Sequence, residues 1–240
     1  MFLKDRSQQT EQLDNFSLTG TQLQRTLSEL GHINWLFGNT RTLKGAIRKE
    51  IQAAGIQQAT IVDLGCGGGD VLAAIARDAT NKDYEVRLIG IDGNPASLAF
   101  AKVQWNGIKN LEFLEADILS SSFQLPKCDF LISSHFLYHF KDEDLPTFLH
   151  KQLKQVQFGA IFSELDRHFL ALQLFKFVSL LLGYSKMTRQ DGQTAVRRAF
   201  RQKELQDILQ DTHFSQYHLA YKWAFRHLLT IYCSHDDLLE

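Results

Sequence analysis

The sequence is poor in the residues that build crosslinked or low-complexity proteins. Its 240 residues include only three prolines and three cysteines. The cysteines, Cys66, Cys128 and Cys233, are odd in number and lack a metal-binding spacing, so neither a disulfide framework nor a zinc motif is predicted. We expect them to be reduced residues that pack in a core. No internal repeat or low-complexity tract is present, which argues against repeat architectures.

Long apolar runs and an excess of one charge are also missing. No extended apolar stretch follows the first positive charges, so no secretory signal is predicted and we expect a cytoplasmic protein. The net charge is −1 and the pI is near 6.8. The chain as a whole therefore has no strong field that attracts nucleic acid or an anionic membrane. With 44% hydrophobic residues, it is long enough to bury the core of one large α/β domain.

What the sequence does have is an apolar, β-branched run that ends in a glycine cluster, within residues 59–69. This pattern predicts a strand and a ligand-binding turn, because Gly65, Gly67 and Gly69 can adopt positive φ angles and let a ligand approach the main chain. A dinucleotide fingerprint would need glycine at Asp70. The residues instead spell D-x-G-x-G-x-G, led by Asp63. Taken alone, Asp63 and the glycines also fit a purely steric turn.

Four more apolar runs follow, at residues 86–91, 111–117, 128–134 and 160–164. The first ends at Asp92, about 20 residues after the glycine loop, where a carboxylate can accept hydrogen bonds from both ribose hydroxyls. The next ends at Asp117. Because open parallel sheets bind ligands at the carboxyl ends of their strands, we expect these side chains to share one site.

These motifs, in this order, resemble those of the class I S-adenosylmethionine-dependent methyltransferases over residues 59–165. The resemblance implies S-adenosylmethionine as the cofactor, with S-adenosylhomocysteine as its product. Asp117 and Ile118 match the adenine-binding pair of that family. The positions that match the family's cofactor site are Asp63, Gly65, Cys66, Gly67, Gly69, Asp92, Gly93, Asn94, Asp117, Ile118 and Ser133.

The resemblance also implies a fold, namely a doubly wound, Rossmann-like α/β domain with a seven-stranded, mostly parallel sheet. Strands predicted at residues 217–223 and 226–232 would complete that sheet, the last one antiparallel. Residues 1–54 are expected to form an N-terminal helical extension or cap, with two or three short helices within residues 20–54. Residues 55–240 are expected to form the methyltransferase domain, with a helical cap insertion at about residues 167–199.

The expected insertion begins with an apolar segment at residues 169–184, which is too short and too interrupted to span a bilayer. It predicts a core or lid helix, and the alternative is a helix that also rests on membrane lipid. A polar loop is predicted at residues 185–193. A helix is predicted at residues 194–205, with Arg198 and its basic neighbours on a solvated face. Contact of this basic group with an acidic substrate or RNA is the alternative. In the extension, Trp35 and Phe37 either line the ligand pocket or pack the helices onto the core.

Three histidines qualify by position as catalytic residues, and His139 and His168 are preferred to His135. Methyl transfer from a sulfonium is an in-line displacement, so a base is needed only for acceptors that must lose a proton. His139 and His168 qualify, because histidine titrates near neutral pH and each follows a strand whose carboxyl end faces the cofactor. His139 lies in a stretch similar to the family's Leu-His-His-Phe, with Tyr138 in place of the first histidine. A capping or packing role is the alternative for both.

The stretch that ends at His168 resembles the Asp-Leu-His-Arg-His segment of methyltransferases associated with polyketide and quinone biosynthesis, with Asp166 in place of the first histidine. We therefore expect methyl transfer to a small hydrophobic or aromatic acceptor, with oxygen as the first choice of atom. RNA or protein methylation and non-catalytic binding of S-adenosylmethionine are the alternatives. No Asn-Pro-Pro-Tyr motif follows the fourth strand, which argues against base methylation.

No metal site is predicted. His135 and His139 have the spacing of two ligands on one helix face, but no third ligand accompanies them at a known spacing. The expected partner is a small-molecule acceptor, nucleic acid is not expected, and peripheral contact with a membrane is kept as an alternative.

Overall fold

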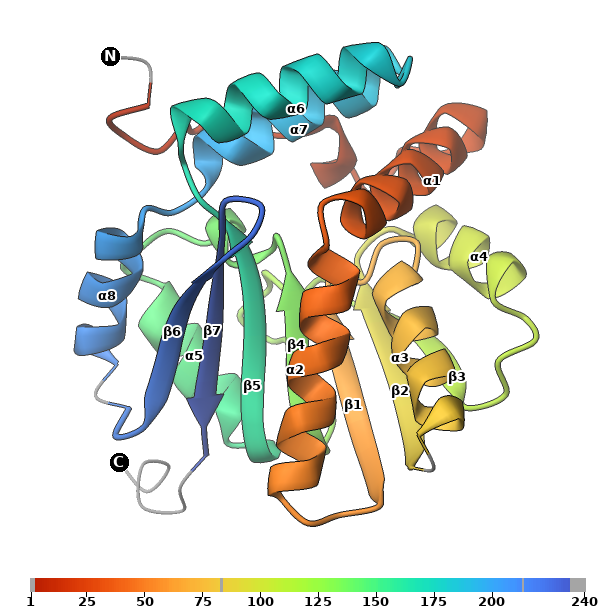
Figure 1. Ribbon diagram of the computed structural model, residues 1–240, viewed down its shortest axis with the longest axis vertical. Helices are drawn as coiled ribbons and strands as arrows, with labels where there is room; N and C mark the ends of the chain where they lie inside the picture. Colours follow the sequence, from red (N-terminus) through yellow and green to blue (C-terminus); the bar gives the residue numbers. More distant parts are fainter. Residues whose placement is uncertain (1–2, 83, 213, 234–240) are drawn as a thin grey trace.

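The computed structural model describes residues 3–82, 84–212 and 214–233. A single seven-stranded sheet lies at its centre, with the strand order β3-β2-β1-β4-β5-β7-β6 (Figure 1). The strands are β1 Gln58–Leu64, β2 Glu85–Asp92, β3 Leu111–Glu115, β4 Cys128–Ser134, β5 Val156–Leu165, β6 Tyr217–Lys222 and β7 Arg226–Tyr232. Strands β1 to β5 are parallel, and β7 runs antiparallel to both β5 and β6. The predicted doubly wound fold with an antiparallel last strand is confirmed.

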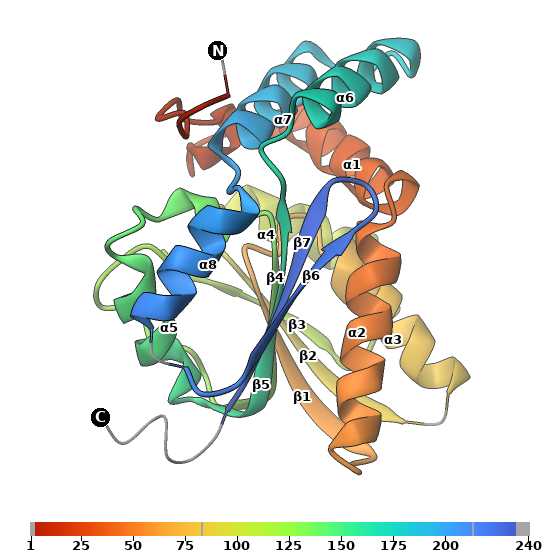
Figure 2. The same cartoon turned by 60° about the vertical axis from the view of Figure 1, so that its left-hand side comes forward.

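The helices form layers on both faces of the sheet. Their bounds are α1 Gly20–Leu36, α2 Asn39–Ala53, α3 Asp70–Asn81, α4 Pro95–Gln104, α5 Leu145–Leu153, α6 Phe169–Leu181, α7 Lys186–Arg198 and α8 Gln202–Asp211, with short 3-10 helices η1 Gln12–Asp14 and η2 Leu137–His139. Figure 2 shows α2 and α3 on one face of the sheet and α5 and α8 on the other. Helices α6 and α7 and most of α1 lie beyond the carboxyl ends of the parallel strands.

The central strands are apolar throughout because both of their faces are covered. In β1, the side chains of Val62 and Leu64 belong to one hydrophobic core, whereas Ile61 belongs to the core on the opposite face. This alternation follows from the two-residue period of a strand. A parallel sheet between two helical layers needs such continuous apolar runs. The same runs made these strands recognisable in the sequence.

The segment predicted as a loop at residues 185–193 is the first part of helix α7. Ser185 caps this helix, since its Oγ accepts a hydrogen bond from the Thr188 amide at 3.2 Å. Two polar side chains of this part of the helix are buried: Thr188 donates to Glu29, and Asp191 accepts from the amide of Gln12. A polar face that is buried against another polar segment leaves no apolar periodicity in the sequence.

The helix predicted at residues 194–205 is divided in two. Helix α7 ends at Arg198, and α8 begins at Gln202. Between them Phe200, which is fully buried, accepts a hydrogen bond at its carbonyl from the Arg167 amide at 3.0 Å. This contact with the chain after β5 holds the backbone out of the helical conformation.

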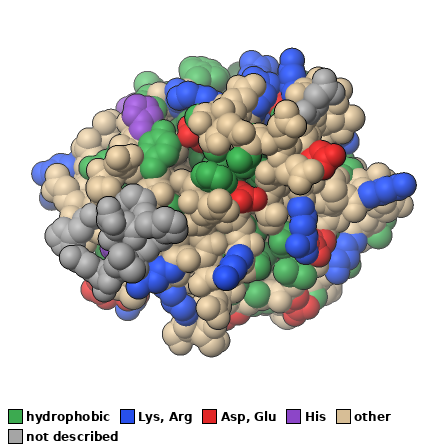
Figure 3. Space-filling view, turned by 90° about the horizontal axis from the view of Figure 1, so that it is seen from below, with side chains coloured by type: hydrophobic (Ala, Val, Ile, Leu, Met, Phe, Trp, Pro, Cys, Tyr) green, Lys and Arg blue, Asp and Glu red, His purple; other side chains and the backbone are tan. Residues whose placement is uncertain are grey.

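Helix α6 is apolar on both sides. Ala171, Leu172 and Phe175 are buried, whereas Phe177 and Leu181 are 65% and 70% exposed. No helix within the described ranges is long and apolar enough to cross a membrane. On the face of the molecule seen from below, basic and acidic side chains of the described residues are interspersed (Figure 3).

Candidate active site

A cavity of about 490 Å³ lies between the carboxyl ends of the strands and a cap. We use the word cap for residues 10–16 together with α1, α6 and α7, all of which contribute lining residues. The opposite wall is made by the turns that follow β1, β2 and β4. The site therefore lies where an open parallel sheet brings the ends of its strands together.

The glycine loop after β1 forms one wall of this cavity. Gly65, Gly67 and Gly69 have φ angles of 69°, 51° and 73°. A Cβ atom at Gly65 would lie 2.7 Å from the ring of Phe136, and one at Gly69 would lie 2.8 Å from that of Phe113. Both the backbone angle and the packing therefore require glycine at these two positions.

Asp92, at the end of β2, binds this loop through its carboxylate. Its Oδ2 accepts a hydrogen bond from the Gly67 amide, and its Oδ1 accepts one from the Asn94 amide, each at 2.9 Å. Burial raises the pKa of Asp92, and these amide donors oppose the shift. Because a carboxylate has about four lone-pair positions, two of them are left for a ligand.

Seven of the eleven sequence-predicted cofactor residues line the cavity. They are Asp63, Gly65, Cys66, Gly67, Asp92, Gly93 and Ile118. Asp63 is only 4% exposed, and its burial together with the charges of Asp70 and Asp92 raises its pKa well above the usual value. The glycine loop and the ends of β1 and β2 are thus brought together as the sequence indicated.

The other four predicted residues lie outside the cavity lining and hold the backbone. Gly69 precedes α3, and Asn94 caps α4 by accepting from the amides of residues 96 and 97. Asp117 accepts from the Leu119 amide at 3.1 Å. Ser133 donates its hydroxyl to the Leu64 carbonyl at 2.8 Å. A residue next to each of them lines the cavity instead, namely Gly68, Gly93, Ile118 and Ser134.

His139 lines the cavity at the end of η2. Its Nδ1 lies 3.0 Å from Nη2 of Arg198 and 3.4 Å from Oδ1 of Asp14. Burial, assisted by the charges of Arg198 and Arg6, lowers the pKa of His139 to about 4, although Asp14 opposes the shift. The ring is therefore neutral at pH 7. Since a guanidinium only donates, the contact with Arg198 places the ring proton on Nε2.

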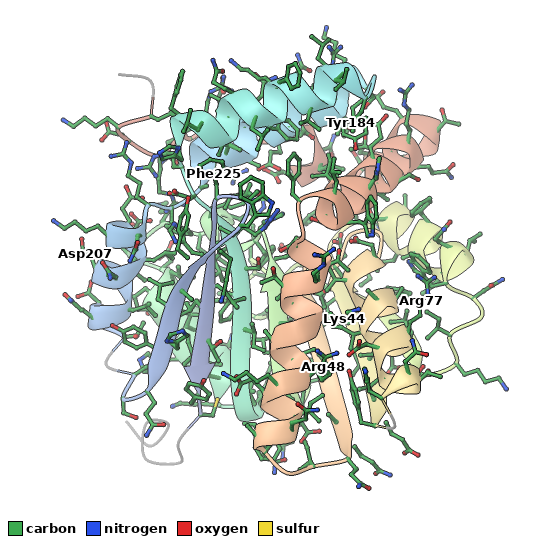
Figure 4. All side chains as sticks on the ribbon, in the orientation of Figure 1. Lys44, Arg48, Arg77, Tyr184, Asp207 and Phe225 are labelled. Carbon is green, nitrogen blue, oxygen red and sulfur yellow. The ribbon has the colours of Figure 1, made fainter. Side chains whose placement is uncertain are left out.

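His168 does not reach the lining of the cavity. It is exposed and caps helix α6, because its Nδ1 accepts a hydrogen bond from the Leu170 amide at 3.1 Å. Its ring stacks on that of Phe225, with 5.2 Å between the ring centres. Phe225 lies beneath α6 in Figure 4. The contacts of His168 are those of a residue that positions α6 over the site.

Arg198 also lines the cavity, although the sequence favoured a solvated position for it. It is 9% exposed, and its Nη1 lies 2.8 Å from Asp14 Oδ2 and 3.2 Å from Glu11 Oε1. These ion pairs connect the end of α7 with η1. They also explain why Arg198 does not lie on a solvated face as expected, since the partner acids come from the opposite end of the chain. Burial and the neighbouring acids raise the pKa of Glu11 to about 8, against the attraction of Arg198.

Residues 61–158 match the methyltransferase domain family. The match includes the glycine loop and strands β2 to β4 described above. Residues 61–158 form a methyltransferase domain, and the sheet around them has the class I methyltransferase fold.

Solved structures of other methyltransferases share this fold. Magnesium protoporphyrin IX methyltransferase from Synechocystis PCC 6803, with bound S-adenosylhomocysteine, has a TM-score of 0.55 and 16% identity over 82% of this chain and 84% of its own. The plantazolicin methyltransferase has a TM-score of 0.58 and 15% identity, and the match covers 89% of this chain and 96% of that protein. Human N-acetylserotonin methyltransferase has a TM-score of 0.61 and 15% identity, and the match covers 88% of this chain and 56% of that protein. No curated protein is significantly similar to the chain in sequence.

The lining of this methyltransferase cavity is strongly acidic. Among the described residues it contains six carboxylic acids and two arginines. They are Glu11, Asp14, Asp63, Asp70, Asp92 and Asp191, with Arg198 and Arg226. Two of these acids, Glu11 and Asp14, contact Arg198. Of the acids in the lining, only Asp63 and Asp92 had been indicated by sequence motifs.

The cap supplies the apolar part of the lining. Leu30, Phe37 and Phe175 face the cavity, whereas Trp35 is 68% exposed. The sequence left open whether Trp35 and Phe37 line the site, and the structure separates the two. No sequence signal distinguished them, because both are aromatic residues at the end of the same helix.

Proposed function

We propose that this methyltransferase transfers the methyl group of S-adenosylmethionine to a small hydrophobic or aromatic acceptor, at oxygen. The observation that carries the proposal is the division of the cavity. One wall has the glycine loop and the Asp92 carboxylate, and the facing cap supplies apolar and aromatic side chains beside the acids Glu11, Asp14 and Asp191. The wall with the glycine loop suits the methyl donor, and the apolar side chains of the cap suit the acceptor.

The residues present fit the donor. The two unused lone-pair positions of Asp92 can accept the ribose hydroxyls, and the open backbone of Gly65 and Gly67 admits the ligand to the main chain. Asp63 and Asp70 place carboxyl oxygens on the same side of the cavity as the loop, where they can accept hydrogen bonds from the donor. Ile118 and Leu119 provide apolar contacts for the adenine. When bound, the donor supplies an activated methyl group on a sulfonium.

The protein's own contribution to transfer is alignment, exclusion of water and, for an acidic hydroxyl, removal of a proton. We retain His139 as the candidate base, because it is neutral at pH 7 and faces the cavity. For Nε2 to accept a proton, the ring must carry its other proton on Nδ1. That proton would be donated to Asp14, in place of the hydrogen bond from Arg198. We assign no proton transfer to His168, in view of its exposure and its capping contact.

The test begins with binding. Calorimetric titration of the wild-type protein should show binding of S-adenosylmethionine and S-adenosylhomocysteine, and much weaker binding of a nicotinamide dinucleotide. A panel of phenols should then be methylated when a labelled donor is supplied. Preferred binding of the dinucleotide would refute the donor assignment. Methylation of RNA or protein but of no small phenol would refute the acceptor assignment, and donor binding without any turnover would favour a non-catalytic role.

A further inference from the structure

Arg226 is a buried cation that forms no ion pair with an acid of the described residues. It is 2% exposed, begins β7 and lines the cavity. Its Nη1 donates to the Phe37 carbonyl at 3.1 Å, and its Nε has no hydrogen-bond partner among the described residues. The two other buried arginines differ, since Arg167 pairs with Glu204 and Arg198 pairs with two acids.

A guanidinium in this position is costly for the protein alone. Isolated buried charges are unfavourable unless they are paired and hydrogen-bonded. Burial lowers the pKa of Arg226 to about 10, so it still carries its charge at pH 7. Such an arrangement is expected where a ligand supplies the opposite charge.

His135 adds a second unpartnered nitrogen to the same cavity. It follows β4 with a φ angle of 55°, lines the cavity, and its buried Nε2 has no partner among the described residues. Its burial and the nearby charge of Arg226 lower its pKa well below the usual value, so the ring is neutral. A neutral imidazole can donate one hydrogen bond to an anion that Arg226 attracts.

The position of Arg226 indicates which ligand carries that anion. Strand β7 is separated from β1 by β4 and β5, which at about 4.8 Å per strand places it about 14 Å from the strand that bears the glycine loop. Around it the cavity is lined by apolar residues, namely Phe37, Leu165, Ala224 and Phe225. Phe225, which precedes Arg226, lies at the tip of the β6–β7 hairpin beneath α6 (Figure 4). The proposed function assigns such an apolar lining to the acceptor.

We propose that Arg226, with His135, binds a carboxylate group on the methyl acceptor, which makes the acceptor a hydrophobic or aromatic hydroxy acid. The proposal rests on the proposed function. The proposed function requires a small hydrophobic or aromatic acceptor, and the present proposal requires in addition that the acceptor carry a negative charge. The Arg226 guanidinium can donate two parallel hydrogen bonds to a carboxylate, and this gives orientation as well as affinity.

The test compares matched probes on the protein loaded with S-adenosylhomocysteine. Three carboxylates, a hydroxybenzoate, a hydroxycinnamate and a hydroxynaphthoate, are titrated calorimetrically beside their neutral amides. Wild-type protein should bind at least one carboxylate about tenfold or more tightly than its amide, which corresponds to about 1.4 kcal/mol. Arg226→Gln should remove the preference, and Arg226→Lys should keep part of it. Arg41→Gln, at an exposed position, is the matched control and should change nothing.

The remaining outcomes overturn the proposal. They are equal binding of carboxylates and amides by the wild-type protein for all three probes, and a preference that survives in Arg226→Gln. A third arm measures the dissociation constants of S-adenosylhomocysteine and of 5′-methylthioadenosine, which lacks the amino-acid end, for the wild-type protein and for Arg226→Gln. If Arg226→Gln weakens the first and not the second, Arg226 binds the donor's carboxylate and the acceptor assignment is wrong. If the wild-type protein does not bind S-adenosylhomocysteine, the proposed function is refuted instead.

Discussion

Replacing Arg198 with methionine should release the N-terminal part of the cap. The guanidinium donates to Glu11, Asp14 and His139, and methionine fills a similar volume without a charge or a donor. Nearby, the amides of Gln12 and Leu13 donate to the Asp191 carboxylate at 3.0 and 3.1 Å. These two amides report on whether the segment stays in place.

The expected size follows from the pairing. Breaking a buried ion pair by removal of one partner costs about 3–5 kcal/mol when the remaining charge stays buried. Here η1 can move into water with its two acids, so we expect a local loss of about 2–4 kcal/mol and little change in global stability. Amide exchange at Gln12 and Leu13 should then accelerate by about 30- to 1000-fold. Amides in the central strands β1 and β4 should keep their protection.

The same variant should change the titration of His139. Because Arg198 contributes to its lowered pKa, the pKa should rise from about 4 toward the usual value of 6.5 in Arg198→Met. In the wild-type protein the folded-state value lies below the unfolded one, so stability is lost as the pH falls from about 6.5 to about 4. The variant should lose less stability in this range. NMR titration of the histidine measures the first effect, and denaturant unfolding at several pH values measures the second.

Arg197→Met is the matched control, since Arg197 occupies the same turn of α7 without contributing to these ion pairs. Equal exchange rates for Gln12 and Leu13 in the two variants would show that Arg198 does not hold the segment. An unchanged pKa of His139 would show that burial alone sets its value.

Three further predictions concern the site. Asp92→Ala should lose two charge-assisted hydrogen bonds to the donor, about 2–4 kcal/mol, and raise the dissociation constant of S-adenosylhomocysteine by about 30- to 1000-fold in calorimetry; an unchanged constant would remove Asp92 from the ribose site. His139→Ala should lower kcat by about 10²- to 10⁴-fold without weakening donor binding. Because the pKa of His139 is about 4, the wild-type rate should show no step from His139 between about pH 6 and 7. A step there that survives in the variant would belong to another group, and retention of more than about a tenth of kcat would exclude His139 as the base. Phe175→Ala should raise the acceptor KM and cost about 3 kcal/mol of stability, since Phe175 is 8% exposed and lines the cavity. Phe177→Ala, on the exposed side of the same helix, should change either quantity little, and equal effects of the two would refute a role of α6 as a wall of the acceptor site.

The sequence by itself determined the strands, the glycine loop and the acid at the end of β2. These features are local: a strand between two helical layers must be apolar on both faces, and a turn with positive φ angles selects glycine. The positions of Gly65 and Asp92 beside the ligand site therefore follow from local sequence patterns. By contrast, the segment at residues 185–193 was predicted as a loop because α7 buries polar side chains, and no apolar period marks such a helix.

Only the tertiary structure decided which neighbouring residue faces the ligand. Ser133 and Ser134 are equivalent in the sequence, but successive strand residues point to opposite faces, so one donates to Leu64 and the other lines the cavity. The pairing of charges in the site could not be predicted from the sequence either. Arg198 contacts Glu11, which lies 187 residues away in the chain, and Arg226 forms no ion pair with an acid of the described residues. Pairing of charges is a property of packing between distant segments, which no local pattern records.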